Sequence, residues 1–295
     1  MEEKIKFEQT LEKKQFEVQK EIGKGSYGTI FQCYHTIKNQ TYAVKVINKH
    51  PLANPTDIKC FVKESKIMKH LSPHPNILKI FDSFEDTDFS FIVLELCQPN
   101  YDLLERILKG PVSEQQAATY MKNLLEAIVH CHKHGIAHKD IKPDNILFDF
   151  NGNIKLADFG SAEWLFEGGK KRNECVGTFH YMAPEVILGK EHDSTKVDVW
   201  SCGVTLYVML CAIEPFHGET PCDTFKAILK TNLRFPMTTF ISMSTPATDL
   251  IKKMICRDPS KRISAEEALM HPWILKGGVI GDNIQPLKRG ARKFL

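Results

Sequence analysis

The sequence predicts an α+β fold of two lobes, because strand patterns and helix patterns occupy different parts of the chain. Short segments rich in β-branched residues come first, and long amphipathic segments follow. A chain of 295 residues is also long enough to bury a large core. We therefore divide it into a charged N-terminal extension (1–15), a strand-rich lobe (16–96), a helical lobe (97–274) and a basic C-terminal tail (275–295).

The strand-rich lobe contains five candidate strands and one candidate helix. Apolar residues at helical spacing predict the helix over 57–71. β-Branched and aromatic runs predict strands over 16–18, 29–34, 42–47, 77–84 and 89–94. The charged residues 1–15 are expected to form a mobile or weakly helical extension.

The helical lobe opens with a long amphipathic pattern over 113–133, and Ser113 is its expected N-cap. Further helices are expected over 196–210, 223–231, 246–256 and 264–271. A strand-rich part joined by a short connection to a helical part is typical of two lobes with a cleft between them.

The composition argues against nucleic-acid and membrane partners. A net charge of +3 provides no strong field for polyanions. The longest apolar run, 199–213, is shorter than the roughly 18 residues of a membrane span and indicates a buried helix. The nine cysteines lack zinc-like spacing, and the N-terminus lacks the apolar segment of a signal peptide. We therefore expect reduced thiols in a cytoplasmic protein, and we expect a monomer.

A glycine-rich turn formed by Gly23, Gly25 and Gly28 is the first candidate for nucleotide chemistry. The pattern alone is weak, because it also occurs in ordinary turns and in dinucleotide sites. A dinucleotide site needs a strand followed by a helix, whereas strands are predicted here on both sides. A glycine hairpin lets backbone amides approach triphosphate oxygens without an intervening Cβ.

Lys45 lies on the next predicted strand, where its ammonium could reach the α- and β-phosphates of a nucleotide. A lone lysine in a strand is more often a solvated edge residue, so its value comes from this spacing. Glu64, on the predicted helix, is placed to pair with Lys45. The alternative for Glu64 is a surface partner on its own helix.

Two rarer patterns, at 138–145 and 158–160, occur in the order and spacing that phosphoryl transfer requires. Asp140 is placed to accept or orient the proton of a substrate hydroxyl, and Lys142 to put a cation near the γ-phosphate. Asn145 and Asp158 supply the hard oxygen ligands that Mg²⁺ prefers. The cofactors expected are therefore ATP and Mg²⁺.

With these motifs the chain resembles the eukaryotic protein kinase family over 16–273. The resemblance implies a bilobal protein kinase fold, with a five-stranded antiparallel N-lobe, one main helix and a mostly helical C-lobe. A lysine two residues after Asp140 resembles the serine/threonine branch. The resemblance also implies that Thr178 contacts Asp140 and Lys142, that Glu185 pairs with Arg262, and that Asp198 supports the catalytic loop. Adenine would lie against Ile22, Ile30, Ala43 and Leu147 and the hinge from Glu95 to Cys97.

One departure from the family lies at Lys139, where the family usually has arginine. In the family, that arginine often binds a phosphorylated residue of the activation segment. Lysine is a point charge and binds phosphate less specifically. The usual phosphorylated position, four residues before Thr178, holds Glu174. We therefore expect Glu174 to pair with Lys139 and the chain to be active without phosphorylation there, although a merely solvated Glu174 is the alternative.

The end of the helical lobe, at 257–265 and 271–274, resembles the calcium/calmodulin-dependent kinase group. Stretches at 95–99, 157–164, 197–204 and 232–236 are similar to the plant phosphoenolpyruvate carboxylase kinase family. Lys139 and the two terminal extensions depart from it. The sequence holds no D-x-D-x-D-G calcium loop, so a built-in calcium sensor is not expected.

The resemblance implies a protein substrate, with phosphoenolpyruvate carboxylase as the candidate. Three alternatives remain: a calcium-dependent-kinase-like serine/threonine kinase with another substrate, a pseudokinase that acts as a scaffold, and a small-molecule kinase.

Overall fold

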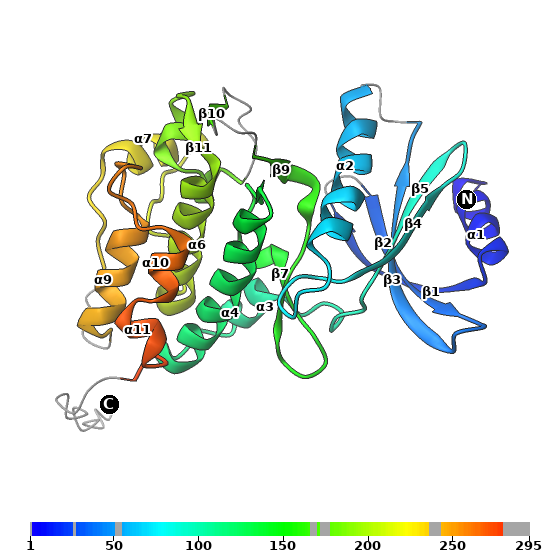
Figure 1. The fold of residues 1–295 in the computed structure, drawn as a ribbon, viewed down its shortest axis with the longest axis horizontal. Helices are drawn as coiled ribbons and strands as arrows, with labels where there is room; N and C mark the ends of the chain where they lie inside the picture. The colour runs from blue at the N-terminus through cyan, green and yellow to red at the C-terminus, as the bar shows by residue number, and fades with distance from the viewer. Residues whose placement is uncertain are drawn as a thin grey trace, which may run out of the picture.

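The computed structural model describes residues 2–25, 28–50, 55–165, 170–171, 178–235 and 243–279. It shows a sheet-rich lobe at the N-terminal end and a helical lobe beside it, connected after residue 94 (Figure 1). This arrangement confirms the predicted bilobal α+β fold.

The N-lobe is built on one five-stranded antiparallel sheet with the order β1-β2-β3-β5-β4. Two strand boundaries differ from the prediction by more than two residues. The first strand continues to the glycine turn, and the fourth begins only at Ile80, because Ile77 forms an isolated bridge to Leu156 instead. The strands are β1 (Phe16–Gly25), β2 (Gly28–His35), β3 (Gln40–Asn48), β4 (Ile80–Glu85) and β5 (Phe89–Leu94).

The two faces of this sheet pack into different hydrophobic clusters, because successive side chains of a strand point to opposite sides. On β3, Ala43 and Ile47 join the cluster that contains Ile67 and Met68 of helix α2 (Pro55–Leu71). The strand residues between them, Val44 and Val46, join the cluster on the other face.

Of the two expectations for residues 1–15, a mobile or a weakly helical extension, the structure shows a helix, α1 (Glu2–Lys13), and this helix packs into the second cluster. Phe7 lies 5.0 Å from Phe31 between ring centroids, and Leu11 is fully buried. Thr10 donates a hydrogen bond to Asp86 at 2.7 Å. Two buried apolar side chains one helical turn apart are enough to attach a mostly charged helix to the sheet.

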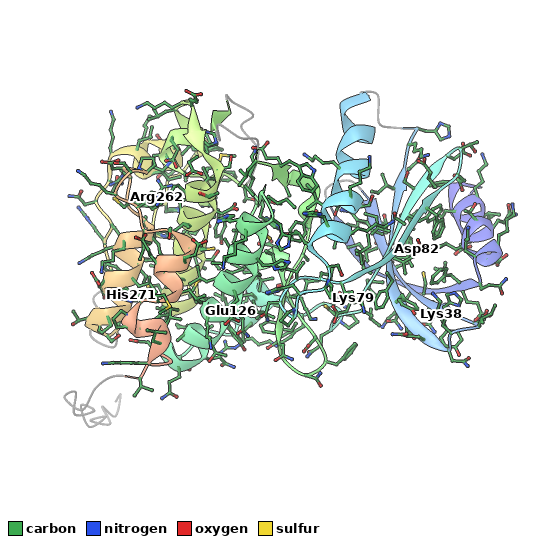
Figure 2. All side chains as sticks on the ribbon, viewed as in Figure 1. Lys38, Lys79, Asp82, Glu126, Arg262 and His271 are labelled. Carbon is green, nitrogen blue, oxygen red and sulfur yellow. The ribbon has the colours of Figure 1, made fainter. Side chains whose placement is uncertain are left out.

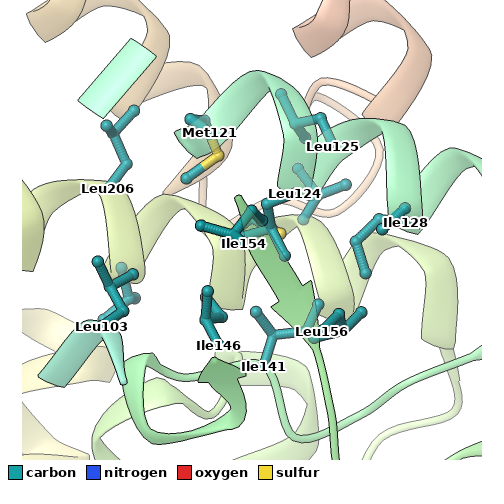
Figure 3. Packing of buried hydrophobic residues seen from close by; sticks show 14 of the residues in the cluster. Leu103, Met121, Leu124, Leu125, Ile128, Ile141, Ile146, Ile154, Leu156 and Leu206 are labelled. Carbon is teal, nitrogen blue, oxygen red and sulfur yellow. The ribbon is translucent and has the colours of Figure 1, made fainter. Parts of the chain in front are cut away.

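The C-lobe is helical, and its core lies around α4 and α6. Ser113 caps α4 by accepting a hydrogen bond from the amide of Gln116, as predicted. Figure 3 shows side chains of α4 packed over the hairpin of β7 (Ile146–Phe148) and β8 (Ile154–Leu156). The helices are α3 (Leu103–Leu108), α4 (Glu114–Lys133), α5 (Pro184–Ile187), α6 (Ser194–Cys211), α7 (Pro221–Lys230), α9 (Thr245–Met254), α10 (Ala265–Leu269) and α11 (Pro272–Leu275).

The apolar run 199–213 forms most of α6, whose residues from Val197 to Cys211 are all buried within the C-lobe. Within the part of the chain that the structure describes, no helix has the length and apolar character needed to cross a membrane. The seven cysteines whose side chains are described are free thiols.

The docking of α1 can be tested by truncating Leu11. Replacing a fully buried leucine with alanine should lower the free energy of unfolding by about 2–5 kcal/mol, because it removes apolar contacts and leaves a cavity. Ile5 lies on the same helix but is half exposed, so Ile5→Ala should change it by about 0.5 kcal/mol or less. Denaturant unfolding measures both. Equal stability of Leu11→Ala and wild type would contradict the packing of α1.

Candidate active site

The cleft between the lobes contains a cavity of about 370 Å³. Both lobes contribute side chains to its wall, some charged or polar and others apolar. The lining residues are Lys24, Ile30, Lys45, Glu64, Met68, Leu78, Leu94, Asp102, Lys142, Asp144, Asn145, Leu147, Ala157 and Asp158.

Lys45 lies in this cavity and pairs with Glu64. Its Nζ is 2.9 Å from both carboxylate oxygens of Glu64 and 3.5 Å from Oδ1 of Asp158. Lys45 and Glu64 are each about 97% buried. Burial alone would lower the pKa of Lys45, but the two carboxylates outweigh it and raise the pKa, so the ammonium stays charged. The predicted pair is therefore formed, and it ties α2 to β3.

The glycine hairpin of β1 and β2, in which Gly25 pairs with Gly28, contributes Lys24 and Ile30 to the cavity wall. Gly28 is required by a close approach of two strands. A Cβ at this position would lie 2.4 Å from the carbonyl oxygen of Val46 and 2.8 Å from Cγ1 of Ile47. At Gly23 the nearest atom would be 3.9 Å away, an ordinary contact.

Asp140 lies in the loop between β6 (Ile136–Ala137) and β7, and neighbouring donors hold both of its carboxylate oxygens. Lys142 donates to Oδ2 at 2.9 Å and also to the hydroxyl of Thr178 at 2.8 Å. The amide and hydroxyl of Thr178 donate to Oδ1 at 3.1 and 3.2 Å. The contacts expected of Thr178 are thus present.

These contacts decide the protonation state of Asp140. Partial burial disfavours the carboxylate, but the hydrogen bond and charge of Lys142, with further donors, lower the pKa below its usual value. Asp140 is therefore ionised at neutral pH. Such a weak base is better suited to orient a hydroxyl than to remove its proton early.

The backbone before Asp140 is held by Asp198 of α6. The Asp198 side chain is fully buried. Its carboxylate accepts hydrogen bonds from the amide of His138 at 2.9 Å and from the amide of Lys139 at 2.8 Å. The ring of His132 lies 2.9 Å from the same group. Burial opposes ionisation, yet His132 and these amides lower the pKa of Asp198, so the carboxylate remains charged.

Asn145 and Asp158 fit a site for Mg²⁺. The amide nitrogen of Asn145 donates to the carbonyl oxygen of Asp140 at 2.8 Å, so its own oxygen remains the acceptor. Asp158 lines the same cavity and has a left-handed backbone conformation (φ 58°). Among the described residues no cluster of three or more histidine, cysteine or acidic side chains could hold a metal alone. Two oxygen donors suit an ion whose other ligands are phosphate oxygens and water.

The remaining predicted residues occupy three kinds of position. Ile30 and Leu147 line the cavity, whereas Ala43 and Cys97 are buried in the adjacent core and Ile22 packs against it. The side chain of Glu95 turns to Lys155, with 3.0 Å between Oε1 and Nζ. Any role of Glu95 toward adenine would therefore belong to its backbone.

The predicted partner of Lys139, Glu174, lies outside the described residues. Within the described part of the chain, Nζ of Lys139 is 3.1 Å from Oε2 of Glu163. Sequence reasoning also missed four apolar residues of the cavity wall, Met68, Leu78, Leu94 and Ala157. The alternation of β5 could have indicated Leu94, which joins Ile92 in the cluster on the α2 side.

A fold of this kind, with these groups in one cleft, defines a protein kinase domain. The sequence pattern of the protein kinase domain matches residues 16–274, and the chain belongs to the protein kinase family.

Among curated proteins, the chain is similar to calcium-dependent protein kinases of plants. It is 40% identical to calcium-dependent protein kinase 8 of Arabidopsis thaliana over 263 residues, which cover 88% of this chain and 49% of that protein. It is 39% identical to calcium-dependent protein kinase 7 of Arabidopsis thaliana over 265 residues, with the same coverage. It is 37% identical to calcium-dependent protein kinase 8 of Oryza sativa subsp. japonica over 263 residues, or 88% of this chain and 48% of that protein. The chain spans about half the length of these relatives.

The close approach at Gly28 makes a testable difference within the glycine hairpin. Gly28→Ala should lower the free energy of unfolding by about 1–3 kcal/mol, because β2 and β3 must separate to admit the methyl group. It should also raise the KM for ATP. Gly23→Ala is the matched control, and it should have a smaller effect on both quantities. Thermal unfolding and steady-state kinetics measure them, and equal effects of the two substitutions would disagree with this packing.

Proposed function

We propose that this chain is a serine/threonine protein kinase that transfers the γ-phosphoryl group of ATP to a protein hydroxyl, with Mg²⁺. The observation that carries the proposal is the convergence of five polar side chains on one cavity, Lys45, Glu64, Lys142, Asn145 and Asp158. Lys45 is paired with Glu64 there, Asp158 lies 3.5 Å from Lys45, and Asn145 and Lys142 contact the neighbouring Asp140. Membership of the protein kinase family supports the same activity.

Each group has a separate task in this reaction. Lys45 binds phosphate oxygens, and Glu64 fixes the direction of its ammonium. Asp140 accepts a hydrogen bond from the attacking hydroxyl and aligns it with the phosphorus. Lys142, held between Asp140 and Thr178, keeps a cation beside the transferred group. Mg²⁺ held by Asn145 and Asp158 would neutralise charge on the phosphates, which is the chemistry that the ion supplies.

The two rivals from other classes fit less well. A pseudokinase scaffold usually lacks a catalytic group. Here Lys45, Asn145 and Asp158 line the cavity, and Asn145 contacts Asp140. A small-molecule kinase does not need a surface for peptides. Here Glu185, just after the activation segment, is anchored to Arg262 by two hydrogen bonds of 2.7 and 3.0 Å (Arg262 is labelled in Figure 2). Such a rigid platform suits a protein substrate.

The activity proposal is tested by removing the charge of Asp140. Asp140→Asn should lower kcat by about 100-fold or more, because the substrate hydroxyl loses its acceptor. Asp82→Asn, at an exposed strand position, is the matched control and should leave kcat unchanged. Magnesium-dependent phosphate transfer from labelled ATP to a generic protein acceptor provides the measurement. A wild-type chain that transfers no phosphate with Mg²⁺ present would favour the scaffold.

For the substrate, we infer a phosphoenolpyruvate carboxylase kinase or a close relative. The support is the set of sequence stretches that resemble that family, including Ser-Ala-Glu-Trp after the metal-binding Asp158. The second candidate is a kinase of the calcium-dependent type with another substrate, and the 37–40% identity to such kinases favours it. The 295 residues themselves contain no calcium loop, so the experiment below does not require added calcium.

These two candidates differ in one experiment. Purified plant phosphoenolpyruvate carboxylase, incubated with this chain and labelled Mg-ATP, should incorporate phosphate on serine or threonine. The Asp140→Asn chain should give no more than about 1% of that label, because it lacks the catalytic carboxylate. Label on a generic acceptor but none on the carboxylase would reject the first candidate and leave the kinase activity intact.

A further inference from the structure

The residue before the catalytic aspartate is held in an unusual way. Lys139 has a left-handed backbone conformation with φ 68°, which non-glycine residues seldom adopt. Its backbone amide donates to Asp198, as described above. Its side chain is 91% buried and therefore needs a counter-charge within the protein.

Glu163 provides that counter-charge. Its Oε2 lies 3.1 Å from Nζ of Lys139, and the Glu163 side chain is 87% buried. Glu163 belongs to strand β9 (Glu163–Trp164), which pairs with β6 so that Glu163 lies opposite Ala137. The pairing of β6 with β9 therefore brings Glu163, which follows Asp158 in the sequence, next to Lys139, which precedes Asp140.

The same carboxylate reaches a third element. The hydroxyl of Ser194 donates to Oε1 of Glu163 at 3.2 Å, and Ser194 is buried at the start of α6. Helix α6 also carries Asp198. Lys139 is thus connected to α6 twice: its backbone binds Asp198 directly, and its side chain reaches Ser194 through Glu163.

We propose that Glu163 is a positioning residue for phosphoryl transfer, which supplies from within the chain the anion that Lys139 requires. This inference rests on the proposed kinase activity. With both contacts made, the loop around Lys139 cannot rotate without breaking a buried ion pair, and Asp140 stays aligned. Turnover then needs no phosphoryl group on the activation segment, because the buried cation is already neutralised.

Kinetic constants distinguish a positioning role of Glu163 from a merely structural one. A positioning residue affects kcat and leaves the KM for ATP nearly unchanged. Neither Glu163 nor Lys139 lines the ATP cavity. Glu163→Gln should therefore lower kcat by about 10- to 100-fold, as small misplacements of catalytic groups do, while the KM for ATP changes by no more than about twofold. Lys139→Arg keeps the positive charge and should retain most of kcat.

A double-substitution cycle separates the pair from its parts. Lys139→Gln alone removes the cation 3.1 Å from the Glu163 carboxylate, and Glu163→Gln alone removes the carboxylate beside the buried Lys139 ammonium. The double variant removes both charges of the pair, so its kcat should be no lower than that of the worse single variant. Glu126→Gln breaks a surface ion pair with Lys122, 3.9 Å apart, and should change kcat by less than about 1.5-fold. Figure 2 labels Glu126 on α4.

The decisive measurements are kcat and KM for these variants before and after treatment with a protein phosphatase. We expect the phosphatase-treated wild type to keep its activity, and Glu174→Ala to lose less activity than Glu163→Gln. Full kcat for Glu163→Gln, losses that multiply in the double variant, or inactivation of the wild type by phosphatase would each overturn the inference. If the untreated wild type is active and any of these results is found, only the positioning role of Glu163 is refuted. If the untreated wild type is inactive, the proposed function is refuted as well.

Discussion

The catalytic loop depends on one buried charge, the carboxylate of Asp198. A fully buried carboxylate is costly unless donors surround it, and here two backbone amides and the ring of His132 do so. Because two of these donors are the amides of consecutive residues, His138 and Lys139, the carboxylate also fixes the backbone between them. The left-handed turn at Lys139 and the direction of Asp140 follow from that contact.

On the other side of the cleft, the position of Lys45 follows from the register of the sheet. Lys45 shares a strand face with Ala43 and Ile47, both in the cluster that α2 covers. A slip of one residue would turn the lysine to the opposite face, where α1 packs. The hydrophobic alternation of β3 therefore keeps the ammonium on the face of the sheet where it meets Glu64 and Asp158.

Local motifs in the sequence were sufficient to predict most of the fold and most of the polar residues of the site. Glycines, the β3 lysine and the loop from His138 to Asn145 have fixed spacing within short segments, and short segments are what sequence reasoning handles best. Sequence reasoning failed for contacts between residues that only the tertiary structure brings together. Lys139 and Glu163 are brought together by the pairing of two-residue strands, and nothing in their separation along the chain indicates it. The docking of α1 was missed for a similar reason: Phe7 and Leu11 form too short an apolar stripe to distinguish a packed helix from a solvated one.

The supports of the site are connected to each other. Helix α6 holds the catalytic loop through Asp198, and it reaches Lys139 again through Ser194 and Glu163. Helix α2 holds Lys45 through Glu64, and Lys45 also lies beside Asp158 of the C-lobe. A shift of α2 would therefore break an ion pair about 97% buried on both sides and separate the Glu64 carboxylate from its lysine. The two lobes meet at their catalytic groups through the contact of the buried Lys45 ammonium with the partly exposed Asp158 carboxylate, and a misplaced α2 would remove the second carboxylate that holds this ammonium in place, an electrostatic cost that the aligned cleft avoids.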